Sequence, residues 1–258
     1  MPKTAKAMPD PVPPAPPALL PMLLSFVAGY VDSYAYLALF GLFVAQVTGS
    51  FIIAGAELAR HDYGVAGKLL AIPAFLAAAA ATAALIGVLE ERRRSTLATV
   101  LALEAALLGA FAAMLLLGPR LTDVSDPSGI VAGLFGAMAM GTQSVAVRLL
   151  LRGVPQTNVM TGNMTQLGIE TTELIRAWRR CACAPHDLAA VHAFTAARRR
   201  LWIVLAVAIG FIAGGAMGAL AYATVGLIGV LLATVILCAL AWHCRGAGTE
   251  TVPHGRAR

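Results

Sequence analysis

The feature that most constrains this chain is a series of six long apolar stretches. They are residues 18–42, 65–89, 95–117, 129–151, 201–223 and 225–242. Each is close to or above the roughly 20 residues that a helix needs to cross a bilayer. Inside hydrocarbon the backbone must satisfy its own hydrogen bonds, and the stretches lack the alternation of a β-barrel, so each predicts a helix. Only 12% of the 258 residues are charged, about half the usual share in a soluble domain. The sequence therefore predicts an all-α integral membrane protein with six transmembrane helices.

The remaining regions predict tails and one substantial connection. Residues 1–17 are rich in proline and predict a disordered tail. Residues 18–242 form the expected membrane domain, and residues 243–258 form a second tail. The connection 176–200 carries several arginines and predicts an amphipathic helix at the membrane surface, where arginine can meet anionic headgroups. Lys68 lies one turn inside its stretch and is expected to extend to the interface.

The distribution of Lys and Arg predicts the orientation. With six crossings, 16 of the 19 basic residues fall on the side that carries both termini, and Arg60, Lys68 and Arg120 fall on the other. The positive-inside rule then places both termini in the cytoplasm, at the inner membrane of a bacterium. An eight-helix alternative would add crossings at 43–59 and 156–175. It would place the arginine cluster after the second stretch outside, so six crossings are the prediction.

The two halves of the chain repeat a polar pattern. Each half has a glycine and a buried polar residue inside an apolar stretch, followed about 20 residues later by a Thr-Gly segment. The segments are Gly29-Tyr-Val-Asp32 with Gln46-Val-Thr48-Gly49-Ser50, and Gly141-Thr-Gln143 with Asn158 and Thr161-Gly162-Asn163.

The repeat units are residues 18–117 and 129–242, and each contains three of the six stretches. An odd number of crossings per unit turns the second unit upside down relative to the first. The prediction is a pair of inverted three-helix repeats, each with a short broken helix, as in many transporters.

At these residues the chain resembles the YoaK-like family of bacterial membrane proteins, a domain of unknown function. The resemblance rests on AGYVDSYAYL at 28–37, FVAQVTGS at 43–50, AMGTQSVAV at 139–147 and NVMTGNMTQLG at 158–168. It covers roughly residues 20–242. It implies a membrane fold and location but little chemistry. Ser50 departs from the family pattern, which more usually has Asn third after Thr-Gly.

Buried polar residues are the candidates for a solute site. Asp32 lies about fourteen residues into its stretch, where an ionised carboxylate costs about 2.5–3.5 kcal/mol. It either lines a solute or proton site or makes a hydrogen bond between helices. The amides of Gln46, Gln143, Asn158 and Asn163 can donate and accept, so they either line the same site or hold helices together.

The two Thr-Gly segments predict short helices at 49–59 and 162–175, with Thr48 and Thr161 as N-caps. Helix N-termini carry partial positive charge and could hold a polar or anionic solute if they dip into the membrane. The alternative is a pair of helices lying at the two membrane surfaces. Gly49 and Gly162 would allow close backbone approach in either case.

Glu104 is a second acid inside an apolar stretch, about 13 Å from the start of its helix. No Lys or Arg lies at helical spacing from it. It is either a proton-coupling residue or a protonated side chain that bonds a neighbouring carbonyl.

The hypothesis from these residues is a permease for a small polar solute. The alternative is a non-transporting membrane scaffold or sensor. We find no P-loop, HExxH, GxSxG or CxxCH motif, so neither an enzyme nor a cofactor is predicted. Cys181-Ala-Cys183 with His186 could bind a soft metal, although reduced thiols are the main expectation. Expected partners are the lipid bilayer and the solute, with no nucleic acid. The GxxxG patterns between Gly210 and Gly218 favour bundle packing or a homodimer.

Overall fold

The computed structural model describes residues 18–60, 65–92 and 95–247. The predicted tail 1–17 and residues 248–258 lie outside the described residues. The described chain is helical and contains no strand. Its elements are α1 (Leu19–Ala38), α2 (Val47–Arg60), α3 (Val65–Glu91), α4 (Thr96–Leu117), α5 (Pro127–Leu150), α6 (Met160–Cys183), α7 (Leu188–Val225), the 3₁₀ turn η1 (Gly226–Val230) and α8 (Leu231–Ala247).

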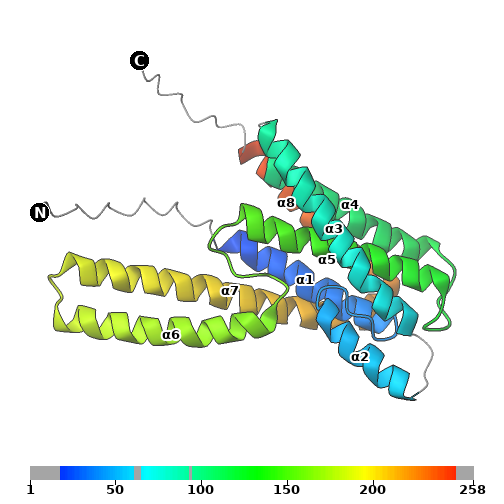
Figure 1. Cartoon of the computed structure of the whole chain (residues 1–258), viewed down its shortest axis with the longest axis horizontal. Coiled ribbons are helices and arrows are strands. Elements are labelled where there is room, and N and C mark those ends of the chain that lie inside the picture. The colour runs from blue at the N-terminus through cyan, green and yellow to red at the C-terminus, as the bar shows by residue number, and fades with distance from the viewer. Residues whose placement is uncertain (1–17, 61–64, 93–94, 248–258) are drawn as a thin grey trace, which may run out of the picture.

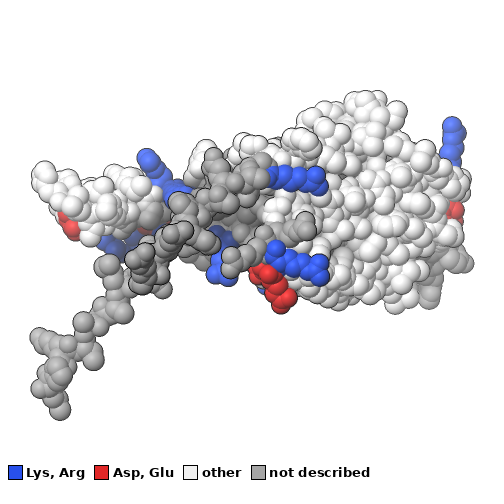
Figure 2. Space-filling view, turned by 90° about the horizontal axis from the view of Figure 1, so that it is seen from above, with Lys and Arg blue, Asp and Glu red and all other residues white. Residues whose placement is uncertain are grey.

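Four helical segments of the described chain are long and apolar enough to cross a membrane. They are Val65–Glu91, Thr96–Leu117, Pro127–Leu150 and Leu188–Arg245. The last contains α7 and α8, which are separated by η1; the first residue of η1, Gly226, has φ +64°. Segments of this length and composition are typical of a membrane protein. Along the bundle the visible surface is almost free of charge, and Lys and Arg gather where α6 and α7 leave it (Figure 2).

The first helix is shorter than the expected stretch 18–42. It ends at Ala38 because the chain turns sharply there: Phe40 and Gly41 have φ of 53° and 89°, and the Gly41 amide donates to the Tyr36 carbonyl. The apolar residues that follow form a buried loop instead of a last helical turn. Composition alone does not reveal this turn, because Leu42 and Val44 are as apolar as the helix before them.

The α6–α7 region differs most from the prediction. A short helix 162–175 and a surface connection 176–200 were expected, but α6 runs to Cys183 and α7 begins at Leu188. Asp187 caps α7, since its Oδ1 accepts a bond from the Ala189 amide at 2.9 Å. The helix that was expected to begin at residue 201 therefore starts thirteen residues earlier. The two helices form a hairpin that extends beyond the other helices (Figure 1).

Glycines on α7 allow it to pack closely against α1, its main partner. Added Cβ atoms on Gly210, Gly214 and Gly218 would overlap the carbonyl oxygens of the α1 residues Met22, Phe26 and Tyr30, respectively. The GxxxG face is thus filled by α1 of the same chain. Bundle packing, one of the two roles expected for these patterns, accounts for this face.

Substitution of Gly214 by leucine is expected to destabilise the fold by at least about 1–3 kcal/mol, because the new side chain would overlap the α1 backbone. Gly87→Leu is a matched control, since an added Cβ on this exposed α3 residue meets nothing within 4 Å. Thermal unfolding in detergent, monitored by size-exclusion chromatography, measures the difference in stability between the two variants. Equal midpoints for the two variants would contradict the proposed α1–α7 packing.

Candidate functional site

The loop between α1 and α2 is buried in the protein. Leu42, Val44 and Ala45 are at most 5% exposed and belong to the main hydrophobic core. Two glycines of α5 make room for the loop: an added Cβ on Gly133 would overlap Leu42, and one on Gly136 would lie 3.1 Å from Val44. Irregular backbone at membrane depth requires such cover, because lipid cannot satisfy its amides.

Asp32 satisfies the amides of this loop. Its Oδ1 accepts bonds from the backbone N–H groups of Val44, Ala45 and Gln46 at 2.8, 2.7 and 3.3 Å, and the residue is 3% exposed. Of the two expected roles, the hydrogen-bonding role has direct geometric support, although its partner is a loop backbone and not another helix. The α2 helix starts directly after this anchored loop.

Gln143 has a comparable role in the second half. Its Nε2 donates to Thr157 Oγ1 at 2.7 Å and to the Leu24 carbonyl at 2.9 Å. The next residue, Ser144, donates to Asn158 Oδ1 at 3.1 Å. Ser144 follows Gly141 by three residues, as Asp32 follows Gly29. The segment before α6 is therefore anchored by neutral groups where the first half uses a carboxylate.

Neither predicted threonine caps a helix. Thr48 and Thr161 are the second residues of α2 and α6, and both are exposed. The N-cap of α6 is Val159, and no side chain caps that helix. Gly162 is exposed, Gly49 packs against the ring of Phe43, and the Asn163 amide donates to the Gln156 carbonyl at 2.6 Å. The helices begin two residues earlier than the predicted starts at 49 and 162, because side-chain hydrogen bonds already hold the loops before them.

Each of these helices is tied to the next by an ion pair that the sequence reading missed. Glu57 of α2 pairs with Lys68 of α3 at 2.5 Å, and Glu170 of α6 pairs with Arg200 of α7 at 3.1 Å. Each glutamate lies nine residues after the threonine of its Thr-Gly segment. Extending the repeat by those nine residues would have found both acids.

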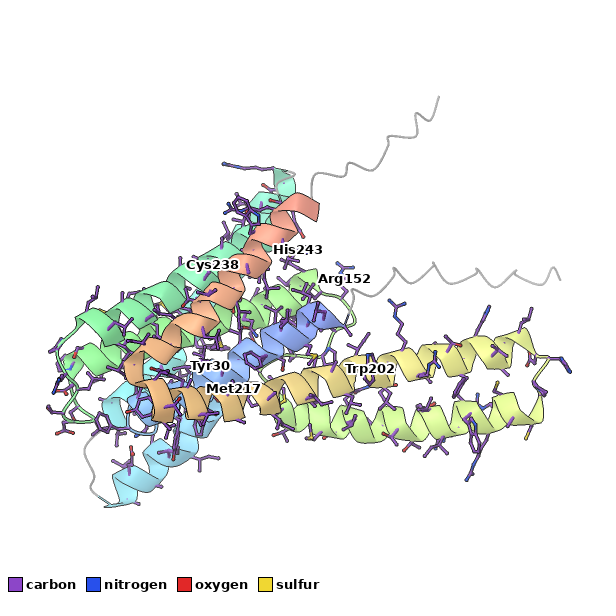
Figure 3. The ribbon with its side chains drawn as sticks, turned by 180° about the vertical axis from the view of Figure 1, so that it is seen from behind. Tyr30, Arg152, Trp202, Met217, Cys238 and His243 are labelled. Carbon is purple, nitrogen blue, oxygen red and sulfur yellow. The ribbon has the colours of Figure 1, made fainter. Side chains whose placement is uncertain are left out.

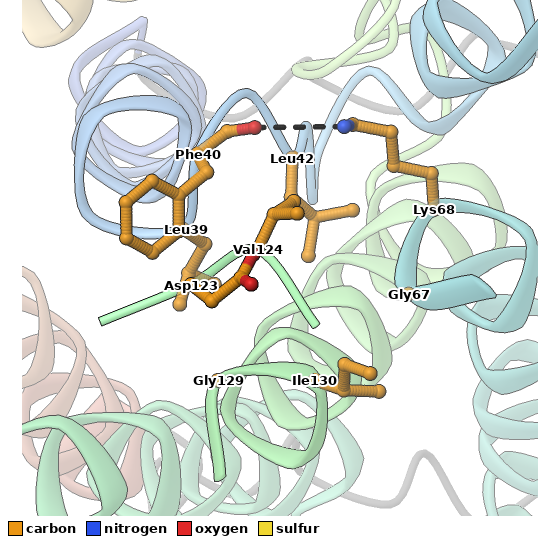
Figure 4. Close-up of a pocket in the computed structure, with 9 residues that line it drawn as sticks. All are labelled: Leu39, Phe40, Leu42, Gly67, Lys68, Asp123, Val124, Gly129 and Ile130. Carbon is orange, nitrogen blue, oxygen red and sulfur yellow. Dashed lines mark hydrogen bonds between the residues drawn. The ribbon is translucent and has the colours of Figure 1, made fainter. Parts of the chain in front are cut away.

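Lys68 was expected to extend to the membrane interface, but its side chain is buried. It is 1% exposed and donates to Glu57 and, at 3.5 Å, to the Phe40 carbonyl (Figure 4). The cavity beside it has a volume of only about 20 Å³, room for a single water molecule. Little space is therefore left beside the Lys68 side chain, while Glu57 is 21% exposed.

The Glu170–Arg200 pair is more open. The Arg200 side chain is 54% exposed, against 2% for Lys68. A cavity of about 270 Å³ lies beside it, between α6, α7 and the segment after α5. It is lined by Gly153, Val154, Pro155, Gly162, Asn163, Gln166, Glu170, Arg200, Ile203 and Val204. Gly162 and Asn163 are the predicted site residues that line this cavity, and Asp32, Gln143 and Glu104 do not line it.

Glu104 is fully buried in α4, and neither carboxyl oxygen has a hydrogen-bond partner among the described residues. Gln143 Oε1 is also buried and unpartnered. One turn before Glu104, Val100 packs with Ala146 of α5 in a small cluster. Since α4 and α5 are joined by a short connection and run in opposite directions, Glu104 and Gln143 lie at similar depth. An isolated buried carboxylate is strongly disfavoured, so Glu104 is held neutral in this state.

Comparison with known proteins identifies the family. The family model described as "Protein of unknown function (DUF1275)" matches residues 20–243, so the chain belongs to this family. No curated protein and no solved structure matches the chain.

Proposed function

We propose that this DUF1275 protein is an inner-membrane transporter for a small polar solute, built from two inverted halves with six crossings. In this arrangement α1, α3, α4, α5, the second part of α7 and α8 cross the membrane, α2 is a half-helix, and α6 leaves the bundle beside the first part of α7. The 14 residues of α2 span about 21 Å, too short to cross. Both termini lie in the cytoplasm, as the distribution of Lys and Arg favours.

The packing of the helices supports the inverted repeat. If α1 to α4 correspond to α5 to α8, the contact of α1 with α7 corresponds to that of α5 with α3, and both are extensive. The two contacts also share a detail. Gly29 of α1 lies against the Phe211 carbonyl of α7, and Gly141 of α5 lies against the Phe75 carbonyl of α3. Inverted repeats that rock against each other are typical of transporters.

The observation that carries the proposal is the difference between the two ion pairs. Glu57–Lys68 and Glu170–Arg200 occupy matching places in the repeat, yet Lys68 is buried beside a cavity of about 20 Å³ and Arg200 is half-exposed beside one of about 270 Å³. Two equivalent gates in different states are what alternating access requires. In the proposed orientation the closed gate faces the periplasm and the open cavity faces the cytoplasm.

This site differs from the one expected from sequence. Asp32 and Gln143 hold the loops that precede α2 and α6, so they act on the site through the backbone. The solute contacts fall to Asn163, Gln166, Glu170 and Arg200. No catalytic role is proposed.

Solute flux into proteoliposomes, measured with a panel of small polar solutes, tests the proposal. The wild type should move at least one solute faster than empty liposomes and faster than the variant Glu170→Gln. A matched control is Glu173→Gln on the same helix, whose carboxylate pairs only with the exposed Arg176. If no solute moves faster than in empty liposomes, the transport proposal is wrong.

Proton coupling is proposed for Glu104, which among the buried acids of the described residues is the one without a partner for either oxygen. The variant Glu104→Gln keeps the size and the neutral state of the side chain, so it should fold with a melting temperature close to that of the wild type. It should lose the acceleration of flux by an imposed pH gradient. Unchanged gradient dependence would exclude Glu104 as the coupling group.

The rival function is a scaffold that transports nothing. It is favoured by the hydrogen bonds of Asp32 and Gln143, which serve the protein's own backbone and side chains. A scaffold predicts that the two ion pairs behave independently, whereas a transporter predicts that opening one closes the other.

A further inference from the structure

The cavity between α6 and α7 is lined by a small set of charged and polar side chains. Its charged residues are Glu170 and Arg200, and its other polar side chains are the amides of Asn163 and Gln166. Both carboxylate oxygens of Glu170 have a partner: Oε1 accepts from Gln166 Nε2 at 2.8 Å, and Oε2 accepts from Arg200 Nε at 3.1 Å. The negative charge of Glu170 is already paired with Arg200, which disfavours a cationic ligand.

Arg200 is only partly occupied. Glu170 engages its Nε, while Nη1 and Nη2 make no hydrogen bond or ion pair with the described residues. The guanidinium is thus oriented by a buried carboxylate and retains a pair of parallel donors. That geometry matches a carboxylate or phosphate group, which accepts two such bonds at once.

The start of α6 adds positive potential to the same cavity. Gly162 lines it, and the amides of the first turn of α6 have no side-chain cap. In the first half the corresponding loop amides are held by the Asp32 carboxylate. The equivalent residue in the second half is the neutral Ser144, which bonds Asn158. In the first half a carboxylate therefore binds the loop amides before the short helix, whereas in the second half no carboxylate holds the matching position.

The surroundings also favour an anion. Arg152 follows α5 beside the cavity residue Gly153 (Figure 3 labels Arg152). This additional positive charge raises the local concentration of anions.

We propose that this cavity binds an oxyanion group, a carboxylate or a phosphate, through the Nη1 and Nη2 atoms of Arg200. The volume of about 270 Å³ suits a molecule smaller than a drug-sized ligand. The inference rests on the proposed transport function only where it identifies the bound oxyanion as the transported solute. The same chemistry is found in anionic lipid headgroups, so the two sources must be separated by experiment.

The test is isothermal titration of the full-length protein in detergent with inorganic phosphate, acetate and lactate. Wild type should bind at least one of them saturably. Arg200→Gln should weaken binding about tenfold to a hundredfold, as expected for losing a charged hydrogen-bonding group. Arg200→Lys keeps the charge without the paired donors and should give an intermediate loss. Arg198→Gln, two residues before Arg200 and outside the lining of this cavity, should bind like wild type.

A second arm separates solute from lipid. The titrations are repeated in nanodiscs of phosphatidylcholine with and without phosphatidylglycerol. Binding that persists in both supports a soluble oxyanion, and binding abolished by phosphatidylglycerol in an Arg200-dependent way assigns the same site to a lipid headgroup and overturns the solute class. No saturable binding in any condition, or equal affinity of wild type and folded Arg200→Lys, would overturn the oxyanion site. Flux of a cationic or neutral solute without anion binding would leave transport standing and remove only this inference.

Discussion

Replacement of Asp32 by alanine is expected to lower the free energy of unfolding by about 3 kcal/mol or more. The substitution leaves three loop amides, those of Val44, Ala45 and Gln46, without an acceptor, and each unsatisfied buried group costs about 1–3 kcal/mol. The effect should appear as a lower melting temperature and a smaller folded fraction in size-exclusion chromatography.

Two control variants define the cause. Asp32→Asn keeps one acceptor oxygen and should lose less stability than Asp32→Ala. Ser144→Ala removes a single hydrogen bond at the matching place of the second half and should cost about 1 kcal/mol. If Asp32→Ala were no less stable than Ser144→Ala, the carboxylate would not be holding the loop. Loss of flux in Asp32 variants must therefore be read together with their stability.

Removal of the Lys68 charge is expected to have the second largest effect. Lys68→Met leaves the Glu57 carboxylate without its cation, and breaking a buried ion pair costs about 3–5 kcal/mol. Because Glu57 is 21% exposed, the expected loss is nearer to about 2 kcal/mol. Arg200→Met, at the matching but half-exposed pair, should cost about 1 kcal/mol or less.

A double-mutant cycle isolates the pair. Lys68→Met combined with Glu57→Gln should recover part of the loss of Lys68→Met, because no unpaired charge then remains. Thermal unfolding of the wild type, both single variants and the double variant gives the coupling energy. Strictly additive changes would mean that the pair does not couple α2 to α3.

The helices could be predicted from sequence because apolar length is a direct consequence of bilayer thickness. The starts of α3, α4 and α5 lie within two residues of their predicted positions. The end of α1 could not be predicted, because the turn at Phe40 and Gly41 is imposed by packing of the loop on Gly133 and Gly136 of α5, more than ninety residues away. The start of α7 depends on a local cap at Asp187, which precedes a segment too polar to read as part of a crossing.

The candidate site could be predicted only in part. The repeat points to the segments that contain Gly162 and Asn163, and these two residues line the open cavity. It gave Asp32 and Gln143 as solute contacts because sequence shows that a polar group is buried but not which atoms satisfy it. In the sequence Arg200 is one of several arginines in the expected surface connection. Its ion pair is not visible there, because Glu170 lies thirty residues away across the hairpin.

Thiol accessibility tests the alternating-access account most directly. In a background without Cys181, Cys183, Cys238 and Cys244, single cysteines replace Ile203, which lines the open cavity, or Leu42, which lines the closed one. A membrane-impermeant thiol reagent is applied to vesicles of each orientation. The account predicts that Ile203→Cys reacts only from the side of the α6–α7 hairpin. Adding Lys68→Met and Glu57→Gln should raise the rate at Leu42→Cys from the opposite side and lower the rate at Ile203→Cys. An unchanged rate at Ile203→Cys, when Leu42→Cys has become reactive, would contradict it.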